Sequence, residues 1–512
     1  MSNNKPFGPK SRLTLSPSKF SALPILLGIG LTLLAVVSGL AVAVIGIQAA
    51  IFISALILGA ASLFLPLRYL VVLLVVVGFV VMGQLIYFAR IDKATWLPFL
   101  LGLLLFVRLP GELMRRNSSK PAHVSFRPVQ SNAVVGFLVL YFATLIASTL
   151  INQSAPLQVF VSSKEYLFLW GLYFVIAAGL VAPELMAKIW NLLPWLLLLQ
   201  LPLILYQRFF VAARRAETHM GAEWDAVVGA FGGNPDGGGS SGAMGIFVVF
   251  SITLVIARWR QGSFKGTHCF IILASGLLAL LLAEVKFAVL LLPISIAVAF
   301  RREFGARPLA AFGALFAAGS IAALVLLSYQ AQFSNNAVER SSGGYFEHIF
   351  KASTDDKFIN HQTGEIGRVS AIRFWADQQS GGVNSLIGEG MGASRKGEMI
   401  VGPAAKRWLF NIARSSLVIL LWETGLLGTC AFILMLVAAY FYAQKIASDP
   451  KTLSDERPVL LACGAGLVLL LLELPYNTDI FYSPQIQILL MFFLGQIAMS
   501  GGRQATIGVV KS

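Results

Sequence analysis

An arginine stands at the edge of a long apolar run in the last third of the chain and is followed by spaced small residues. The stretch ARSSLVILLWETGLLG covers residues 413–428, with Ser415 directly after Arg414. Nine residues separate Ser415 from Gly425, and Gly428 completes the pattern. A guanidinium group stays charged in proteins and presents a planar fork of donors that fits phosphate oxygens. Arg414 is therefore a candidate anion ligand, although snorkelling from a helix end is a plainer role for it.

Other cations also border apolar runs. Arg214, Arg215 and Lys286 each lie at or close to the end of such a run. A cation beside a membrane span is costly unless it snorkels, pairs or lines a polar cavity. Several cations converging from separate spans would suit a phosphate group. For Lys286 the alternative is an ion-paired, solvated turn with Glu284.

Candidate general bases lie in the long polar stretch 329–412, which contains His361, Glu365, Asp377 and Asp355. Nothing in the sequence chooses among them. No histidines, cysteines or carboxylates have metal-ligand spacing, apart from the weak signal of the adjacent pair Asp355–Asp356. We therefore expect chemistry that needs neither a metal ion nor a cofactor.

The composition requires a membrane environment for the elements that carry these residues. The chain has 512 residues, of which 57% are hydrophobic and 12% charged, with a net charge of +15. Soluble domains average about 25% charged residues, and many runs here exceed the roughly 18 apolar residues that mark a membrane span. The positive balance is typical of basic cytoplasmic loops, so we expect no nucleic-acid partner. The fold class is predicted as all-α, an integral membrane protein with multiple spans.

About fourteen transmembrane helices are predicted, in four blocks. A cytoplasmic tail, 1–21, precedes eleven spans in 22–328, which include a smaller periplasmic loop, 212–241. One large periplasmic loop, 329–412, precedes three spans in 413–498, and a cytoplasmic tail, 499–512, ends the chain. The spans are expected at 22–42, 45–65, 67–89, 95–109, 131–151, 165–182, 189–211, 242–258, 268–283, 285–300, 307–328, 413–444, 458–475 and 480–498. Those at 95–109, 268–283 and 285–300 are short and are expected as tilted hairpins or half-helices.

The orientation follows from the alternation of basic and less basic connections. Lysines and arginines gather in the tails and in every second loop, which the positive-inside rule places in the cytoplasm. Long translocated loops escape this rule, so the cations of 329–412 do not oppose it. The segment GGNPDGGGSSG, within 212–241, lacks the Gly-Lys-Ser/Thr of a phosphate-binding loop and is expected to be a flexible loop or a gate.

In layout and short motifs, residues 190–430 resemble the bacterial O-antigen ligase and O-antigen polymerase superfamily of membrane glycosyltransferases. Members place a large outer loop between late spans, as here. GRVSAIRFWADQQSGGVNSLIGEGMGASRKGE resembles their loop pattern through Gly367, Arg368, Trp375 and the glycines at 388, 390 and 392. FGGNPDGGGSSGAMGIF resembles their Asn-Pro segment, and EVKFAVLL places Lys286 where members often have arginine. Ligases carry histidine before the spaced Ser and Gly pattern, and Arg414 occupies that position here.

The resemblance implies glycosyl transfer from a polyprenyl-diphosphate oligosaccharide, expected on undecaprenol, at the periplasmic face of a bacterial inner membrane. The implied diphosphate ligands are Arg215, Lys286, Arg368, Arg373 and Arg414, and the candidate bases are His361, Glu365 and Asp377. Because the ligase histidine is replaced, a polymerase of lipid-linked repeat units is favoured over a ligase. A transporter of lipid or polysaccharide is the alternative of another class. Expected partners are membrane lipids, a chain-length regulator and a flippase.

Overall fold

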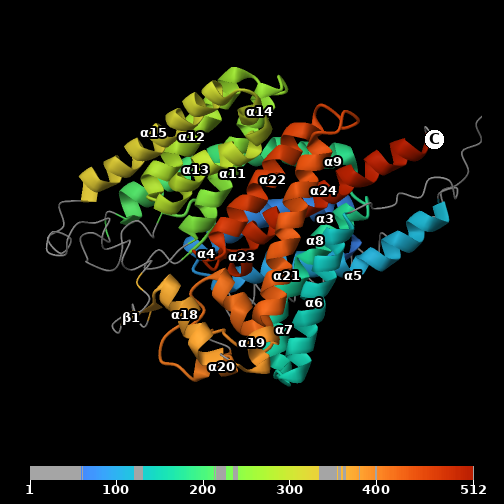
Figure 1. Cartoon of the computed structure of the whole chain (residues 1–512), viewed down its shortest axis with the longest axis vertical. Coiled ribbons are helices and arrows are strands. Elements are labelled where there is room, and N and C mark those ends of the chain that lie inside the picture. The colour runs from blue at the N-terminus through green and yellow to red at the C-terminus, as the bar shows by residue number, and fades with distance from the viewer. Residues whose placement is uncertain are drawn as a thin grey trace, which may run out of the picture. The chain divides into compact units, whose positions relative to one another are not determined.

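The computed structural model describes residues 59, 62–119, 131–212, 214, 227–233, 240–333, 355, 359–360, 365–379, 381–397 and 400–510. By its internal contacts the chain divides at Leu65, and nearly all described residues belong to the unit Pro66–Ser512. This unit is built of helices, with one short antiparallel pair of strands (Figure 1). The expected spans 22–42 and 45–65 fall outside the described residues, apart from the last few positions of the second.

Nine helical segments in the described part of the chain are long and apolar enough to cross a membrane. Each coincides with a span expected from the sequence, which confirms a helical protein with multiple spans. They are Leu67–Tyr87, Asp92–Arg116, Asn132–Ile151, Pro156–Ala177, Pro183–Ala212, Ser241–Arg260, Gly266–Ala283, Ser416–Ala447 and Pro484–Arg503.

These segments contain the following elements. They are α3 (Leu67–Val76), η1 (Val77–Val81), α4 (Met82–Tyr87), η2 (Asp92–Thr95), α5 (Trp96–Ser119), α6 (Asn132–Ile151), α7 (Pro156–Ser163), η3 (Lys164–Phe168), α8 (Trp170–Ala177), α9 (Pro183–Tyr206), η4 (Gln207–Ala212), α11 (Ser241–Arg260), α12 (Gly266–Ala283), α21 (Ser416–Ala447) and α24 (Pro484–Val510). Three further expected spans are also helices: α13 (Lys286–Ala299), α15 (Pro308–Phe333) and α22 (Glu456–Glu473). The segment expected as a short span at 95–109 is instead part of the 24-residue helix α5.

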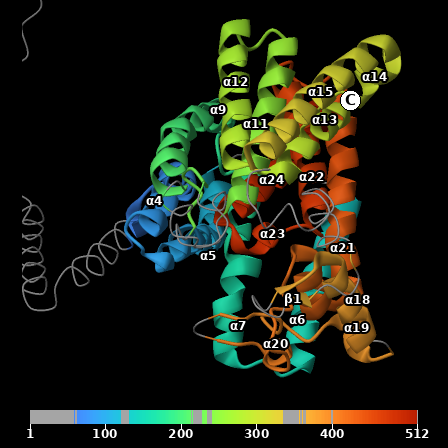
Figure 2. The same cartoon turned by 90° about the vertical axis from the view of Figure 1, so that its left-hand side faces the viewer.

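The remaining elements are short and lie at the ends of the long helices. They are α14 (Arg301–Ala306), β1 (Ile359–Asn360), β2 (Glu365–Ile366), α18 (Arg368–Gln379), α19 (Val383–Ile387), α20 (Pro403–Lys406) and α23 (Asp479–Tyr482). Figure 2 shows α18, α19 and α20 gathered beside α7 at one end of the unit, with α14 at the opposite end. We call these ends the α18 end and the α14 end.

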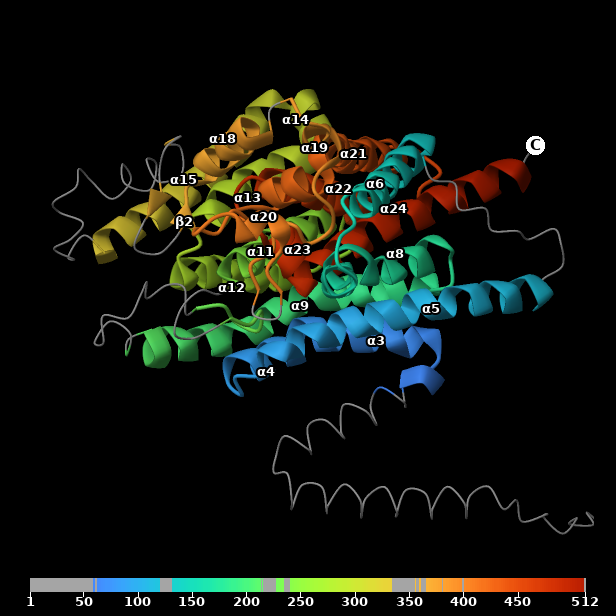
Figure 3. The same cartoon turned by 90° about the horizontal axis from the view of Figure 1, so that it is seen from below.

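The core of the unit forms around α11, α22 and α24, whose side chains are buried along most of their lengths. Seen from below, α3, α4 and α5 lie on one flank, while α6 and α21 lie on the opposite flank (Figure 3). Aromatic rings fill the centre: Trp190 of α9 packs against Phe492 and Phe493 of α24 and against Phe250 of α11. The apolar runs of the sequence thus become a packed helical body that presents its remaining apolar surface outward.

The span expected at 413–444 is two helices joined at a break. Gly425, within α21, has φ 62° and ψ −168°, which no helix adopts. At about 1.5 Å per residue, the 32 residues of α21 would extend about 48 Å, more than a hydrocarbon core of roughly 30 Å. The break therefore separates a short first half, Ser416–Thr424, from the spanning half.

Part of the predicted periplasmic loop 212–241 is buried among the helices. Residues 227–232 lie among the helices and have almost no exposed surface, and Gly233 is partly exposed. Gln207 accepts hydrogen bonds from the amides of Val228 and Gly229, and Gln200 accepts one from the amide of Ala230. Gln485 of α24 donates to the carbonyl of Phe231. Side-chain amides thus satisfy an irregular backbone inside the bundle, where water cannot. Of the segment GGNPDGGGSSG, expected to be a flexible loop or a gate, residues 234–239 lie outside the described part.

Candidate functional site

The eight predicted site residues differ in whether the structure describes them and in where they lie. Arg215 and His361 lie outside the described residues, and Glu365 is described only as backbone in β2. Arg373 and Asp377 are exposed on α18, five and nine residues after Arg368. At about 100° per residue these positions project from sides of the helix other than that of Arg368. Lys286, Arg368 and Arg414 remain, and each stands at or just before the first residue of a helix.

The starts of two of these three helices meet at Tyr476, in the turn that joins α22 to α23. The Arg368 guanidinium lies 4.0 Å from the centre of the Tyr476 ring, and its Nε donates to the Tyr476 carbonyl at 2.6 Å. Phe287, next to Lys286, stacks on the same ring at 3.8 Å with an interplanar angle of 9°. The Phe287 ring covers one face of the Tyr476 ring, so the Arg368 guanidinium lies against the opposite face. Tyr476 thus brings the starts of α13 and α18 together.

The helix that follows the third cation, Arg414, is hydrogen-bonded to the same turn. Ser416, two residues after Arg414, donates both its amide and its hydroxyl to the carbonyl of Asn477 at 2.8 Å. Ser415 caps α21 by accepting from the amide of Val418. Ser415 of the spaced pattern therefore has a structural role, because it fixes the helix start that Arg414 precedes.

The start of a fourth helix, α11, also reaches this turn. Asp479 accepts hydrogen bonds from the Asn477 side chain at 2.6 Å and from the amide of Ala243 in the first turn of α11. A carboxyl group at a helix N-terminus is favourable for the helix dipole. Burial nevertheless raises the pKa of Asp479 to about 7, although hydrogen bonds with the Glu473 side chain and the Ala243 amide lower it. The turn 474–479 is thus surrounded by the beginnings of four helices, and we call it the hub turn.

A polar pocket of about 240 Å³ lies beside the hub turn. Its walls include Lys164 and Glu165 of η3, Arg395 and Lys396, and Tyr482 of α23. Ala413, the neighbour of Arg414, also lines it. Small-molecule sites usually measure about 300–1,000 Å³, so this pocket is sized for one group of a ligand.

Charge in this pocket is predominantly positive. The Arg395 guanidinium forms an ion pair with Glu165, and the Lys164 ammonium lies 3.6 Å from the same carboxylate and 4.6 Å from the centre of the Trp96 ring. Burial alone would lower the pKa of Arg395, but the attraction of Glu165 outweighs it and the pKa is raised. Burial also raises the pKa of Tyr482 well above its ordinary value, so its phenol stays neutral and can donate a hydrogen bond.

The segment 388–397 is latched to the bundle by the buried carboxylate of Glu423. Glu423 accepts from the Tyr166 hydroxyl at 2.8 Å, the Gly392 amide at 2.6 Å and the Ser394 hydroxyl at 2.6 Å. These donors come from η3 and from the loop, so one side chain of α21 joins both. Because Arg395 follows Ser394 directly in the chain, this attachment positions its guanidinium next to the Glu165 carboxylate.

The glycine pattern at 388, 390 and 392 has a backbone explanation. All three residues have φ between 77° and 94°, a region that side chains rarely adopt. A Cβ on Gly388 would lie 2.4 Å from the backbone of Glu423, and one on Gly392 would lie 2.2 Å from the Ser162 hydroxyl oxygen. The segment is therefore wedged between α6, α7 and α21, and it places the wall of the polar pocket.

Sequence reasoning missed Tyr476, Glu165, Arg395 and Glu423. Glu423 carried a usable signal, because a lone carboxylate inside an apolar span is expensive and calls for partners. The other three carried none, since each owes its role to neighbours that are distant in sequence. In the described part of the chain, no three histidine, cysteine, aspartate or glutamate residues are grouped as metal ligands would be.

The arrangement can hold an anion at the α18 end of a membrane-embedded helical body. Arg368 contacts the hub turn, the helix starts that bear Lys286 and Arg414 meet the same turn, and Arg395 and Lys396 line the adjoining pocket. No protein-family model matches this chain, and no curated protein is significantly similar to it. The resemblance described from the sequence therefore rests on the motif residues themselves.

Proposed function

We propose that this protein polymerises lipid-diphosphate-linked oligosaccharide repeat units by glycosyl transfer at the hub turn. The observation that carries the proposal is that the helix starts bearing Lys286, Arg368 and Arg414 all meet one turn, through the contacts of Phe287, Arg368 and Ser416. All three lie in motifs through which the sequence resembles membrane glycosyltransferases, and Arg414 occupies the position of the ligase histidine. The apolar surface of the bundle gives a polyprenyl chain direct access from the bilayer.

In the proposed reaction the acceptor hydroxyl attacks the anomeric carbon of the donor sugar. The bond from that carbon to the diphosphate oxygen breaks, and the lipid diphosphate leaves with both electrons. The hydroxyl proton passes to a general base, for which the candidates are His361, Glu365 and Asp377 in the loop and Glu165 in the pocket. Positioned cations stabilise the charge that grows on the leaving group, which is a large part of catalysis in such transfers.

Arg414 is assigned to one phosphate of the donor rather than to proton transfer, because a guanidinium keeps its proton at physiological pH. Arg368 is held by the Tyr476 ring and carbonyl, so its position is fixed before substrate arrives. The polar pocket beside Arg414 is assigned to the sugar nearest the diphosphate. Its neutral Tyr482 phenol and its cations supply hydrogen-bond donors for sugar hydroxyls.

The test is turnover by purified protein of a lipid-linked repeat unit extracted from the protein's own host, without any nucleotide sugar. We expect polymer from the unmodified protein, in the presence or absence of a chelator. Arg414→Ala should lose roughly 10²–10³-fold in rate, as when one transition-state donor is removed. Arg414→Lys should restore part of this loss, because the charge returns without the two-pronged geometry.

Arg115→Ala is the matched control, since Arg115 is exposed and only weakly paired with Glu112 at 3.7 Å. It should retain full activity. Polymer formation by Arg414→Ala at the rate of this control would refute the assignment of Arg414. Transfer to a lipid or protein acceptor without chain growth would instead identify a ligase, and high activity in Arg414→His would support that interpretation.

A further inference from the structure

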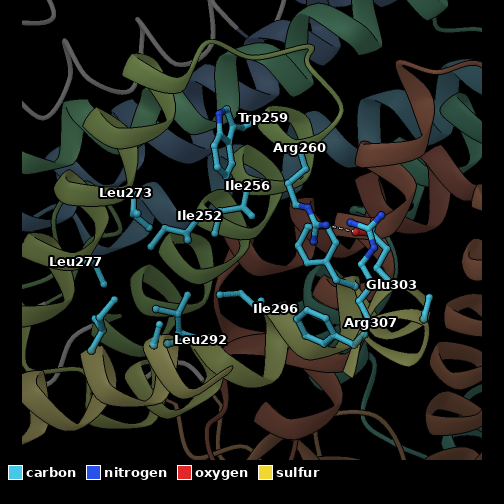
Figure 4. Close-up of a pocket in the computed structure, with 16 residues that line it drawn as sticks. Ile252, Ile256, Trp259, Arg260, Leu273, Leu277, Leu292, Ile296, Glu303 and Arg307 are labelled. Carbon is cyan, nitrogen blue, oxygen red and sulfur yellow. Dashed lines mark ion pairs between the residues drawn. The ribbon is translucent and has the colours of Figure 1, made fainter. Parts of the chain in front are cut away.

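A second, larger cavity lies away from the hub turn. It encloses about 720 Å³ between α11, α12, α13, α14 and α15 (Figure 4). The 20 residues of α11 link the two places, because this helix begins beside Asp479 and ends at Arg260, in the cavity wall. At about 1.5 Å per residue they are separated by roughly 30 Å, the thickness of a hydrocarbon core. The cavity therefore opens at the α14 end and is distinct from the proposed catalytic site.

Most of the cavity wall is hydrocarbon. Ile252 and Ile256 of α11, Leu273 and Leu277 of α12, and Leu292 of α13 line its deeper part, as Figure 4 shows. No charged side chain lines this part. A polar ligand would lose its hydration here without gaining hydrogen bonds, so the deep part accepts only an apolar chain.

Charged groups gather at the other end of the same cavity. Arg260, Glu303 and Arg307 lie together there, and Arg260 forms an ion pair with Glu303. The Arg260 guanidinium also lies 4.8 Å from the centre of the Phe300 ring, which keeps it at the mouth. Of the charged residues that line the cavity, two are arginines and one is a glutamate. The mouth keeps a positive charge after the ion pair is counted.

Trp259 belongs to the same rim and is half exposed, as aromatic residues at a membrane–water boundary commonly are. Next to Trp259, the apolar part of the cavity ends at arginine side chains. A ligand that fits both parts has a hydrocarbon chain and an anionic headgroup. Basic pockets between membrane helices bind such headgroups on the cytoplasmic side, where the alternation of basic loops is expected to place the α14 end. A lipid with a balanced headgroup would leave the excess arginine charge unmatched.

We propose that this cavity is a binding site for an anionic phospholipid of the surrounding bilayer. One acyl chain lies between α11, α12 and α13, and the phosphate contacts Arg307 and the outer side of Arg260. The lipid would fill a gap between α15 and the rest of the bundle, and so stabilise the packing of α15. This inference does not rest on the proposed glycosyl transfer.

The test uses delipidated, detergent-purified protein with two probes, dioleoyl-phosphatidylglycerol and dioleoyl-phosphatidylcholine. Native mass spectrometry counts the retained lipids, and thermal unfolding reports their effect on stability. We expect one phosphatidylglycerol to be retained under conditions that remove phosphatidylcholine, together with a higher melting temperature. Arg307→Gln should weaken retention roughly fivefold, the usual contribution of one basic residue near an anionic lipid surface.

Two further variants keep the test decisive. Leu277→Trp fills the apolar part without changing charge and should also abolish retention. Lys451→Gln removes an exposed cation that does not line the cavity, and it should change nothing. Equal retention of the two lipids, or a loss with Lys451→Gln as large as with Arg307→Gln, would show only non-specific attraction and would overturn the proposal. Retention unchanged by both Arg307→Gln and Leu277→Trp would do the same.

Discussion

Replacing Gly425 with alanine tests how the break in α21 is held. The backbone at this residue has φ 62° and ψ −168°, a conformation that is essentially restricted to glycine and costs other residues about 1–3 kcal/mol. A Cβ here would also lie 2.4 Å from the Leu386 carbonyl carbon and 2.5 Å from the Gly388 nitrogen. Both atoms belong to the backbone, so neither can rotate away.

The two costs act together. Forcing a methyl group into such a contact typically costs about 1–3 kcal/mol, so the total is about 2–6 kcal/mol. That is a large share of the roughly 5–15 kcal/mol by which proteins are usually stable. The least costly relaxation moves α19 away from the break, which shifts the half-helix that follows Arg414. We therefore expect lower thermal stability and reduced polymer formation in Gly425→Ala.

The assay is thermal unfolding of the purified variant in detergent, followed by the turnover measurement at a temperature where it remains folded. Gly111→Ala is the control, because Gly111 lies in α5 and a Cβ there meets nothing within 4 Å. Alanine is the better helix former, so the control should be neutral or slightly stabilised. A Gly425→Ala protein that melts with the control would refute the reasoning about the break.

Three further predictions follow from the latch, the hub turn and the charge pattern. Glu423→Gln should lower the free energy of unfolding by about 1–3 kcal/mol, because the NH₂ group of glutamine would face the hydrogen-bond donors Tyr166, Gly392 and Ser394. An unchanged midpoint of urea unfolding would contradict this. Folding raises the pKa of Asp479 from 3.8 to about 7 and so favours its protonated form. This contribution to stability is complete below about pH 4 and is lost as the pH rises through about 7. The melting temperature should therefore fall across that window more in the unmodified protein than in Asp479→Asn, and parallel profiles would exclude the assignment. Reporters fused at Gln261 and Asn360 should report opposite sides of the membrane, and agreement between them would invalidate the predicted topology.

The sequence by itself determined the membrane-embedded helices. Each of the nine long apolar segments of the described residues coincides with an expected span. This was predictable because the cost of placing a residue in hydrocarbon depends mainly on its own side chain and sums along a run. The beginnings of α13 and α21 were also foreseeable, since Lys286 and Arg414 mark where the apolar runs start.

Irregular backbone was predicted less well, for a physical reason. The segment 227–233 has no periodic pattern, so the sequence does not indicate that it is buried among the helices. It is ordered by Gln200, Gln207 and Gln485, which belong to three separate elements. The break at Gly425 was likewise hidden, because glycine inside an apolar run is common in membrane helices. What distinguishes Gly425 is the close approach of Leu386 and Gly388 from the loop.

Only the tertiary structure decided which charged residues meet. Arg368 and Tyr476 are 108 positions apart in the chain, and Arg395 and Glu165 are 230 positions apart. No local propensity relates such residues, because their pairing depends on how whole helices pack. Glu284 shows the same limit: one alternative from the sequence was a solvated ion pair with Lys286, but Glu284 is buried and its carboxylate pairs with Arg208 at 2.8 Å. Hydropathy is a property of each residue and is read from the sequence, whereas an ion pair is a property of two positions and exists only once the helices are in place.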